Sequence, residues 1–252
     1  MISRLSCVLK LNSSIDSSDL QTNDVVIYSD GNRFRHTYKK GGFFVLSNMS
    51  EGEHLIKITS WKYQTAEIKV TVDYSVNFDI SMVRYVIMNP SPSHPTAARM
   101  PSIRGSFGRQ ADYYILHEDC ELKIAEDSAK EGNTTVKLFS SLGKPVFPSV
   151  FLIKDKSEAK NEFVVIKGLD GDSFLLDSPL KYAHARSTSI VPLIKLSSEA
   201  DGSFFAVLSG GFKKDDSGKY VVKLYVDKGG KLILKEISAS IRGETSLGLI
   251  EV

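Results

Sequence analysis

Apolar and polar residues alternate with a period of two along most of this chain, and this pattern most constrains its fold. Between Leu55 and Val72, Ile56 and Ile58 alternate with Lys57, and a second alternating run follows a Trp-Lys-Tyr corner. Successive side chains of a strand point to opposite faces, so such runs predict antiparallel strands with one wet face. Helical periodicity is nearly absent, and the sequence therefore predicts an all-β protein. Further strands are expected at Leu5–Leu11, Asp24–Ser29, Phe34–Lys39, Phe43–Ser47, Val76–Met88, Val150–Lys154, Phe163–Lys167, Ile190–Leu196, Ser203–Leu208, Tyr220–Val226 and Lys231–Ile241.

A proline-rich stretch divides the chain into two parts. Four of the eight prolines fall within residues 88–105, at Pro90, Pro92, Pro95 and Pro101. Proline fixes φ and removes a backbone donor, so this stretch is expected to be a stiff, extended connector. We predict two β-sandwich domains (Ig-like or transthyretin-like), residues 1–88 and 106–252. Residues 89–105 are the expected linker, and the second domain is expected to carry an insertion at about 150–200.

A short echo links the two halves. Gly41-Gly-Phe-Phe-Val-Leu is followed by Gly52-Glu-His-Leu-Ile-Lys-Ile, and Gly202-Ser-Phe-Phe-Ala-Val-Leu is followed by Gly218-Lys-Tyr-Val-Val-Lys-Leu. Both read as a turn, an aromatic strand, a second turn and an alternating strand. We interpret them as one supersecondary unit that is used twice.

Charge and hydropathy narrow the classes of function. The 252 residues include 32 basic and 30 acidic side chains, a balance that does not favour nucleic acid as a partner. Arg33 and Arg35 alternate with Phe34 and His36, which indicates a wet face opposite a core face. No run approaches the roughly 20 apolar residues that span a bilayer, so direct membrane insertion is not expected. The N-terminus lacks the pattern of a signal peptide, which predicts cytoplasmic assembly, with release as part of a particle left open.

The sequence carries no complete pattern typical of catalysis or metal binding. The five histidines form no pair at metal-ligand spacing, and the run His117–Cys120 would need two further ligands. Cys7 and Cys120 are interpreted as free, mostly buried thiols. No nucleophile elbow, P-loop or dinucleotide fingerprint is present in the sequence. We therefore expect no catalytic residues, no metal and no cofactor, and predict that the protein is not an enzyme.

Residues 3–83 resemble the carboxypeptidase regulatory-like (transthyretin-like) β-sandwich. The resemblance rests on Lys40-Gly-Gly-Phe-Phe-Val-Leu, on Asn48 to Ile58 and on Lys62-Tyr63-Gln64. It implies tight turns at Gly42 and Gly52. It also implies core positions for three apolar side chains, Phe44, Ile56 and Ile58. The module serves as a spacer and docking unit in many proteins, so it implies a fold rather than a reaction.

The junction carries a second resemblance. Tyr85-Val-Ile-Met-Asn-Pro-Ser-Pro-Ser-His-Pro, followed by Ser102-Ile-Arg-Gly-Ser-Phe, resembles a segment of two-domain proteins encoded with phage-tail-like contractile injection systems. His94 stands where that pattern has tyrosine, and its Pro-Phe-Pro core is degraded here. The resemblance implies a tail-end cap, adaptor or baseplate accessory protein. Its expected partners are other protein subunits of a large assembly, in which particle symmetry presents multiple copies.

The candidate interface and linker residues follow from these patterns. Trp61, the single tryptophan, is either an interface anchor or a lid on the core. The alternating run Tyr182-Ala-His184-Ala-Arg186 is a candidate to line a polar groove. The remaining candidates are Tyr85, Pro90, Pro92, Pro95 and Pro101. Two alternatives stay open: a surface adhesin or glycan/receptor-binding module, and an enzyme within residues 150–200 that uses His184 and nearby carboxylates.

Overall fold

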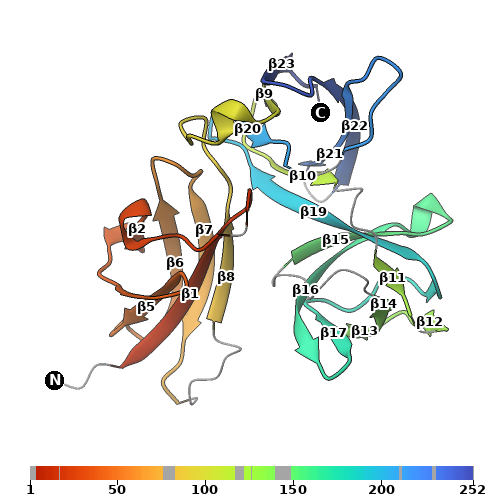
Figure 1. Ribbon diagram of the computed structural model, residues 1–252. Coiled ribbons are helices and arrows are strands. Elements are labelled where there is room, and N and C mark those ends of the chain that lie inside the picture. The colour runs from red at the N-terminus through yellow and green to blue at the C-terminus, as the bar shows by residue number, and fades with distance from the viewer. Residues whose placement is uncertain are drawn as a thin grey trace. The chain divides into compact units, whose positions relative to one another are not determined.

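The protein is all-β, as the alternation predicts (Figure 1). The computed structural model describes residues 4–16, 18–75, 83–116, 122–125, 127–139, 149–209, 212–228 and 231–251. Within these ranges, helical structure is limited to three single turns of 3-10 helix, η1 (Thr22–Asp24), η3 (Ala97–Arg99) and η4 (Glu158–Lys160). The chain forms two compact units, Met1–Met100 and Pro101–Val252.

The first unit contains two four-stranded sheets in its described residues. One has the order β4-β5-β1-β8 and the other β3-β2-β6-β7. Neighbouring strands are antiparallel except β1 and β8, which run parallel. Of the expected strand Val76–Met88, residues 83–88 form β8, and residues 76–82 lie outside the described part. The strands are β1 (Leu5–Ser13), β2 (Val26–Ser29), β3 (Asn32–Arg33), β4 (Thr37–Lys39), β5 (Phe43–Ser47), β6 (Gly52–Thr59), β7 (Ala66–Val72) and β8 (Val83–Met88).

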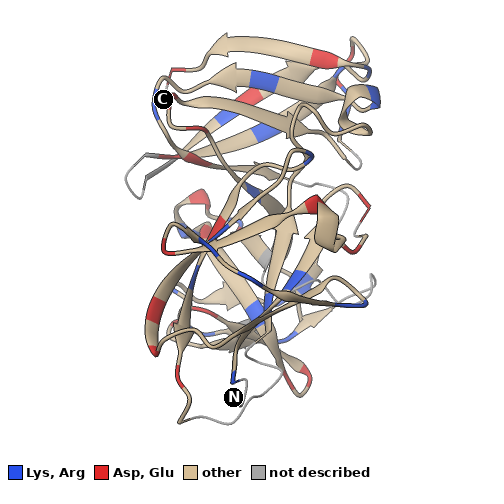
Figure 2. Cartoon of the chain, turned by 90° about the vertical axis from the view of Figure 1, so that its left-hand side faces the viewer, with Lys and Arg blue, Asp and Glu red and all other residues tan. Residues whose placement is uncertain are grey.

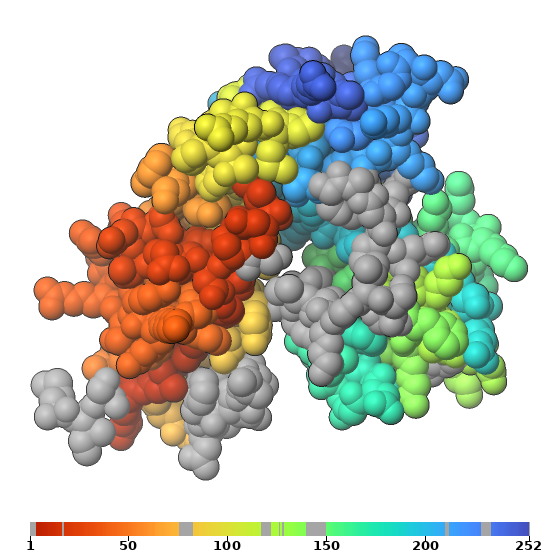
Figure 3. Space-filling model, in the orientation of Figure 1, coloured from red at the N-terminus to blue at the C-terminus, as the bar shows by residue number. Residues whose placement is uncertain are grey.

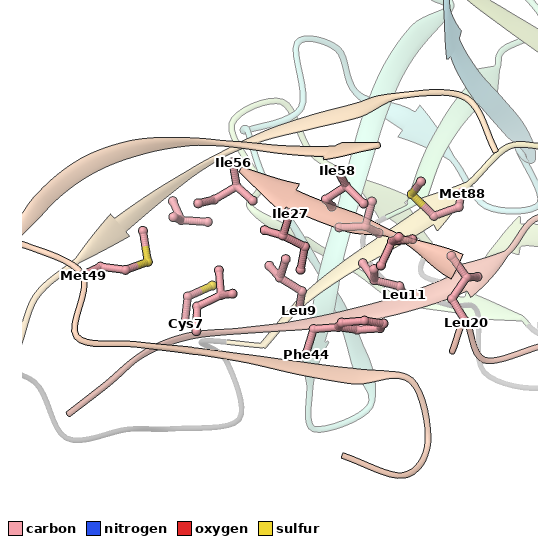
Figure 4. Close-up of a cluster of buried hydrophobic side chains, with 14 of the residues drawn as sticks. Cys7, Leu9, Leu11, Leu20, Ile27, Phe44, Met49, Ile56, Ile58 and Met88 are labelled. Atoms are coloured by element: carbon pink, nitrogen blue, oxygen red, sulfur yellow. The ribbon is translucent and has the colours of Figure 1, made fainter. Parts of the chain in front are cut away.

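Apolar side chains of both sheets form one core (Figure 4). Phe44 from one sheet and Ile56 and Ile58 from the other are fully buried, which confirms the core positions expected for them. The phenyl ring of Phe44 also contacts the rings of His36 and Tyr38, with centroids 5.2 and 5.3 Å away. The period of two therefore separates a dry face from a wet face, as in an antiparallel sheet that covers a core.

Gly42 shows why the turn before β5 needs glycine. Its φ is +70°, and a Cβ at this position would lie 2.9 Å from the carbonyl oxygen of Leu11. The same two residues are joined by a hydrogen bond from the Leu11 amide to the Gly42 carbonyl, 3.0 Å long. A side chain would collide with the strand that this turn holds, so the position requires glycine.

Much of the expected linker is attached to the first unit. The backbone amide of Gln64 donates to the backbone carbonyl of Asn89 across 2.7 Å. The backbone amide of Ser91 donates to the backbone carbonyl of Lys62 across 2.8 Å. Pro90 is buried and forms an isolated antiparallel β-bridge with Tyr63. The segment then turns through η3 before strand β9 (Ser102–Ser106) begins. Residues 102–105 of the expected linker thus belong to a sheet of the second unit.

The second unit contains a three-stranded sheet, β20-β9-β23, a two-stranded sheet, β12-β18, and a ten-stranded sheet within its described residues. The main path of the ten-stranded sheet is β13-β17-β16-β15-β19-β10-β21-β22, with β11 and β14 joined beside β19. Strands after β9 are β10 (Asp112–Leu116), β11 (Leu122–Ile124), β12 (Ser128–Ala129), β13 (Thr135–Val136), β14 (Leu138–Phe139), β15 (Ser149–Lys154), β16 (Glu162–Asp170), β17 (Ser173–Leu176), β18 (His184–Ala185), β19 (Ser189–Ser197), β20 (Ser203–Val207), β21 (Tyr220–Lys228), β22 (Lys231–Ala239) and β23 (Glu244–Leu249).

The second unit repeats the pairing scheme of the first. In the first unit β1 pairs antiparallel with β5 and parallel with β8; in the second, β9 pairs antiparallel with β20 and parallel with β23. Figure 3 shows the yellow atoms around β9 beside the dark-blue atoms of the C-terminal residues. Likewise β6 joins β2 and β7, while β21 joins β10 and β22. The sequence echo falls on corresponding strands, since β5 and β6 match β20 and β21.

The second unit differs from the first by additional strands between β10 and β19. In the first unit β3 follows β2 directly and pairs with it. In the second unit strands β11 to β18, which run from residue 122 to residue 185, lie in the sequence between β10 and its partner β19. The sequence analysis placed the insertion at about 150–200, which covers the later part of this stretch. The added strands enclose their own core, which includes Ile124, Phe151, Ile166 and Leu176. We call residues 122–185, with this core, the inserted lobe.

Candidate functional site

His184 lies at the centre of a cluster of charged groups in the inserted lobe. Only 1% of the residue is exposed. Its Nδ1–H donates to Oδ2 of Asp155 across 2.8 Å, and its Nε2–H donates to Oε1 of Glu162 across 2.7 Å. Because ionised carboxylates only accept hydrogen bonds, this geometry fits a ring that carries a proton on both nitrogens, an imidazolium. We call Asp155, His184 and Glu162 the His184 triad.

A polar hairpin brings the two carboxylates together. Asp155 directly follows β15, and Glu162 is the first residue of β16, which pairs antiparallel with β15. The turn between them is held by side chains: the Ser157 amide donates to Oδ1 of Asp155, and Oδ1 of Asn161 accepts from the Asp155 amide. The two carboxylates therefore face the ring that strand β18 presents.

Burial and hydrogen bonding shift the pKa values of these three groups in opposite directions. Burial by itself lowers the pKa of His184, but its hydrogen bonds to Glu162 and Asp155 outweigh burial, and the pKa is raised above 6.5. Burial raises the pKa of Glu162, but hydrogen bonds from His184 and from the amides of Lys181 and Tyr182 hold it below its usual range. Hydrogen bonds from the Ser157 amide and from His184 lower the pKa of Asp155. The triad thus holds one positive and two negative charges.

The triad contains the histidine and the carboxylates that the enzyme alternative requires, but these groups are shielded from solvent and already bonded to one another. The His184 side chain has 0% exposure and the Glu162 side chain 3%. Both ring nitrogens already donate to carboxylates, so neither has a lone pair for a substrate proton. Among the described residues, no group of three or more His, Cys, Asp or Glu side chains is placed to hold a metal ion.

A second histidine cluster has the composition of a nucleophilic triad. Nδ1 of His54 lies 2.6 Å from Oδ2 of Asp30, and its Nε2 lies 3.4 Å from the Ser50 hydroxyl. Nε2 also lies 2.9 Å from the Ser50 carbonyl oxygen, to which it donates. A general base needs a free lone pair toward the hydroxyl, and this ring directs a proton there instead. The arrangement therefore ties two turns together rather than activating Ser50.

The residues on either side of His184 face solvent. Tyr182 has 38% exposure, while its amide donates to Oε1 of Glu162 across 3.3 Å. The Arg186 guanidinium lies 5.3 Å from the ring centroid of Phe139, itself 49% exposed, and its Nη1 lies 3.2 Å from Oδ1 of Asp127. The alternating run expected to line a groove thus places His184 inward and its two neighbours outward.

Trp61 lies at the surface, with 62% of the residue exposed, so it is not a lid on the core. The Lys62 ammonium sits 5.2 Å from its ring centroid, and the Ser91 hydroxyl donates to its carbonyl oxygen across 3.0 Å. Of the other candidates, Tyr85 and Pro101 are half-buried, Pro90 is buried, and Pro92 and Pro95 are exposed. All of these residues except Pro101 belong to the first unit, whereas the His184 triad belongs to the second.

Charged residues of both signs are interspersed along the described strands (Figure 2). Arg33 and Arg35 are exposed, whereas Phe34 packs against the core, in agreement with a wet face opposite a core face. No helix in the described ranges has the length and apolar character needed to cross a membrane.

Cys7 is a buried free thiol, as expected, and burial raises its pKa to about 11. A thiol that stays protonated is a poor nucleophile, so Cys7 acts as a small core residue. Cys120 and His117 lie outside the described residues.

Sequence reasoning identified His184 but missed Asp155 and Glu162. The two lie 29 and 22 residues before it, in the connection between the expected strands Val150–Lys154 and Phe163–Lys167. A signal was present: two acidic residues flank a short hairpin loop opposite a lone histidine in an alternating run. Without the pairing of strands, however, nothing distinguishes these acids from solvated ones.

Comparison with known proteins adds no relative. No protein-family model matches the chain. A search of curated proteins gives no significant match either.

Proposed function

We propose that this protein is a non-enzymatic structural component of a phage-tail-like contractile injection particle, acting as a tail-end cap, adaptor or baseplate accessory. The observation that carries the structural role is the repeated strand-pairing scheme, combined with charged clusters that are internally satisfied in the described residues. The narrower assignment to an injection particle rests on the sequence resemblance of residues 85–107.

The architecture that goes with this proposal is a pair of β-sandwich domains, the first of the carboxypeptidase regulatory-like type. The shared core of the sheets in residues 1–100 supports a sandwich there. The cluster formed by strands of both sheets around Ile103 and Phe204 supports a second one. Residues between Pro90 and Pro101 would then serve as a short joint that limits how far the two domains swing.

Partners would bind through sheet edges and exposed anchors. Strand β7 lies at the edge of its sheet, and Trp61 precedes it in the turn from β6. An edge strand presents backbone donors and acceptors to an added strand, and an exposed tryptophan supplies apolar contact area. Several copies arranged by particle symmetry would convert weak contacts into tight ones.

The test is co-expression of the full chain with the products of neighbouring genes, followed by size-exclusion chromatography with light scattering. We expect the chain to elute in a complex of high mass with sheath, tube or baseplate proteins. Trp61→Ala should weaken that complex, while Phe139→Ala, which removes an exposed aromatic ring of the second unit, serves as a matched control. A chain that stays monomeric with every neighbour would refute the proposal.

The glycan- or receptor-binding alternative is favoured by one aromatic cluster of the second unit. Phe163 lies between Tyr114 and Tyr225, with ring centroids 5.5 and 5.6 Å away, and all three are half-buried. The Lys195 ammonium lies 6.0 Å from the Tyr114 ring centroid. Half-buried rings beside a charged group are suited to contact with the apolar faces of sugars. Binding of the full chain to a glycan array, lost in Tyr114→Ala, would favour this function over assembly.

A further inference from the structure

Glu162 collects three donors from one short segment of the inserted lobe. Its Oε2 accepts from the Lys181 amide across 2.9 Å, and its Oε1 accepts from the Tyr182 amide and from Nε2 of His184. In this stretch the side chains of Lys181, Tyr182 and Arg186 are exposed, and only His184 points inward. We call residues 181–186 the arm. The described hydrogen bonds of the Lys181 and Tyr182 amides go to this single carboxylate. Residues 184–186 are also held by the pairing of β18 with β12 and by the Arg186 backbone amide, which donates to the Asp127 carbonyl across 3.3 Å.

The fit of the His184 ring depends on one proton. With both nitrogens protonated, each carboxylate receives a donor. Loss of either proton places a nitrogen lone pair against a carboxylate oxygen, 2.7 or 2.8 Å away, in a site closed to water. The carboxylates also lose the positive charge between them.

The charged groups that surround the ring are few in the described structure. Asp155 faces it from the end of β15, and Glu162 faces it from β16. Lys160 of η4 acts on Asp155 and favours its ionised form. Strand β12, which pairs with β18, contributes the buried, apolar Ala129 opposite His184. The two carboxylates therefore dominate the field at the ring.

We propose that the proton on His184 is a pH-dependent lock, which holds the arm on the inserted lobe at mildly acidic pH and releases it at higher pH. Release would free Lys181 and Tyr182 from their present positions, so the surface that this lobe offers to a partner changes with pH. This inference does not depend on the proposed function, because the lock acts within one lobe.

The direction in which pH acts on the lock follows from the pKa shifts of His184, Glu162 and Asp155. The pKa of His184 is raised from 6.5, so its stabilising contribution is complete below pH 6.5 and is lost as pH rises through the folded pKa. The pKa values of Glu162 and Asp155 are lowered from 4.5 and 3.8, so their contribution is lost only as pH falls through those depressed values. The lock is therefore tightest between pH 4.5 and 6.5.

The experiment combines NMR titration of the histidine rings with hydrogen exchange of the full chain, corrected for intrinsic rates. We expect His184 to be a doubly protonated imidazolium at pH 6 and to titrate above 6.5. Amide protection in the arm should fall on the alkaline side by roughly tenfold for each unit by which the His184 pKa exceeds its unfolded value. Protection in β1 and β5 of the first unit should not follow that titration.

Two variants separate the lock from general destabilisation. Glu162→Gln keeps a side-chain oxygen for the arm amides but removes the charge, and should lower the His184 pKa by about one unit or more. Asp30→Asn removes the carboxylate beside His54 and should leave the His184 titration unchanged. The proposal is overturned if wild-type His184 titrates below 6.5, or if it titrates while arm protection stays constant. The wild-type titration decides the outcome even if Glu162→Gln fails to fold.

Discussion

Replacing Phe44 by alanine should destabilise the first unit and leave the second one unchanged. Phe44 is completely buried, and its ring contacts those of His36 and Tyr38. Truncation of a buried phenylalanine costs about 3 to 5 kcal/mol, because apolar burial is lost and a cavity remains. With a urea dependence of roughly 1.5 kcal/mol per molar for a unit of this size, the midpoint should fall by about 2 to 3 M.

The chain carries a built-in reporter for this experiment. Trp61 is the single tryptophan and belongs to the first unit. Selective tryptophan fluorescence therefore follows the unfolding of residues 1–100, while far-UV circular dichroism follows both units. The reciprocal variant is Phe204→Ala, which removes a buried ring stacked on Phe107 at 4.5 Å in the second unit. It should shift the circular dichroism transition and leave the tryptophan transition in place.

Two results would refute this reasoning. If Phe44→Ala moved both transitions together, the two units would unfold as one cooperative body and the proposal of two separate sandwiches would fail. If its cost were below about 1 kcal/mol, Phe44 would not occupy a packed core.

Three further outcomes are expected. Gly202→Ala should lower the free energy of unfolding of the second unit, measured in urea, by about 2 to 4 kcal/mol. The reason is that φ is +83° and the new Cβ would lie 2.3 Å from the backbone nitrogen of Arg109. A neutral effect would contradict the turn geometry. Arg104→Ala removes an exposed ion pair in which two guanidinium nitrogens each lie 3.0 Å from an oxygen of Glu244. It should lower the free energy of unfolding by no more than about 1 kcal/mol. A larger loss of stability that is insensitive to salt would show that the ion pair is not exposed. Trp61→Ala should leave the denaturation midpoint within about 0.5 kcal/mol, measured by circular dichroism, while weakening co-elution with assembly partners; a large loss of stability would show that the exposed ring supports the fold.

Local patterning predicted many of the strands, although none was expected at the positions of β10, β17 or β23. The two alternating runs between Leu55 and Val72 correspond to β6 and β7, and their apolar residues Ile56 and Ile58 are buried. Likewise, the expected strand Phe43–Ser47 has the bounds of β5. Alternation over a few residues depends only on which face of a strand is dry, and that information is local.

The pairing of strands was not accessible in the same way. The parallel pairs β1–β8 and β9–β23 join residues from opposite ends of each unit. Their partners cannot be recognised from composition, because every half-buried strand presents a similar row of backbone donors and acceptors. For the same reason, the sequence suggested an insertion but did not show which strands flank it.

The candidate site shows the same division. On a regular strand Tyr182, His184 and Arg186 would share one face, as the alternating run suggested, but the structure places His184 inward and Tyr182 and Arg186 outward. The two carboxylates that make His184 an imidazolium were not predicted. They reach the ring only because β15 and β16 pair and their turn directs both side chains to one point.

By itself, then, the sequence determined the all-β class, the alternation of dry and wet faces, and a repeated strand unit in the two halves. The tertiary structure alone decided which strands are neighbours, where the inserted lobe begins and ends, and which charges share a buried site. The physical reason is that hydrophobic alternation acts between adjacent residues. Hydrogen bonds and ion pairs such as those of His184 act between atoms a few ångströms apart, whose proximity only the folded chain creates.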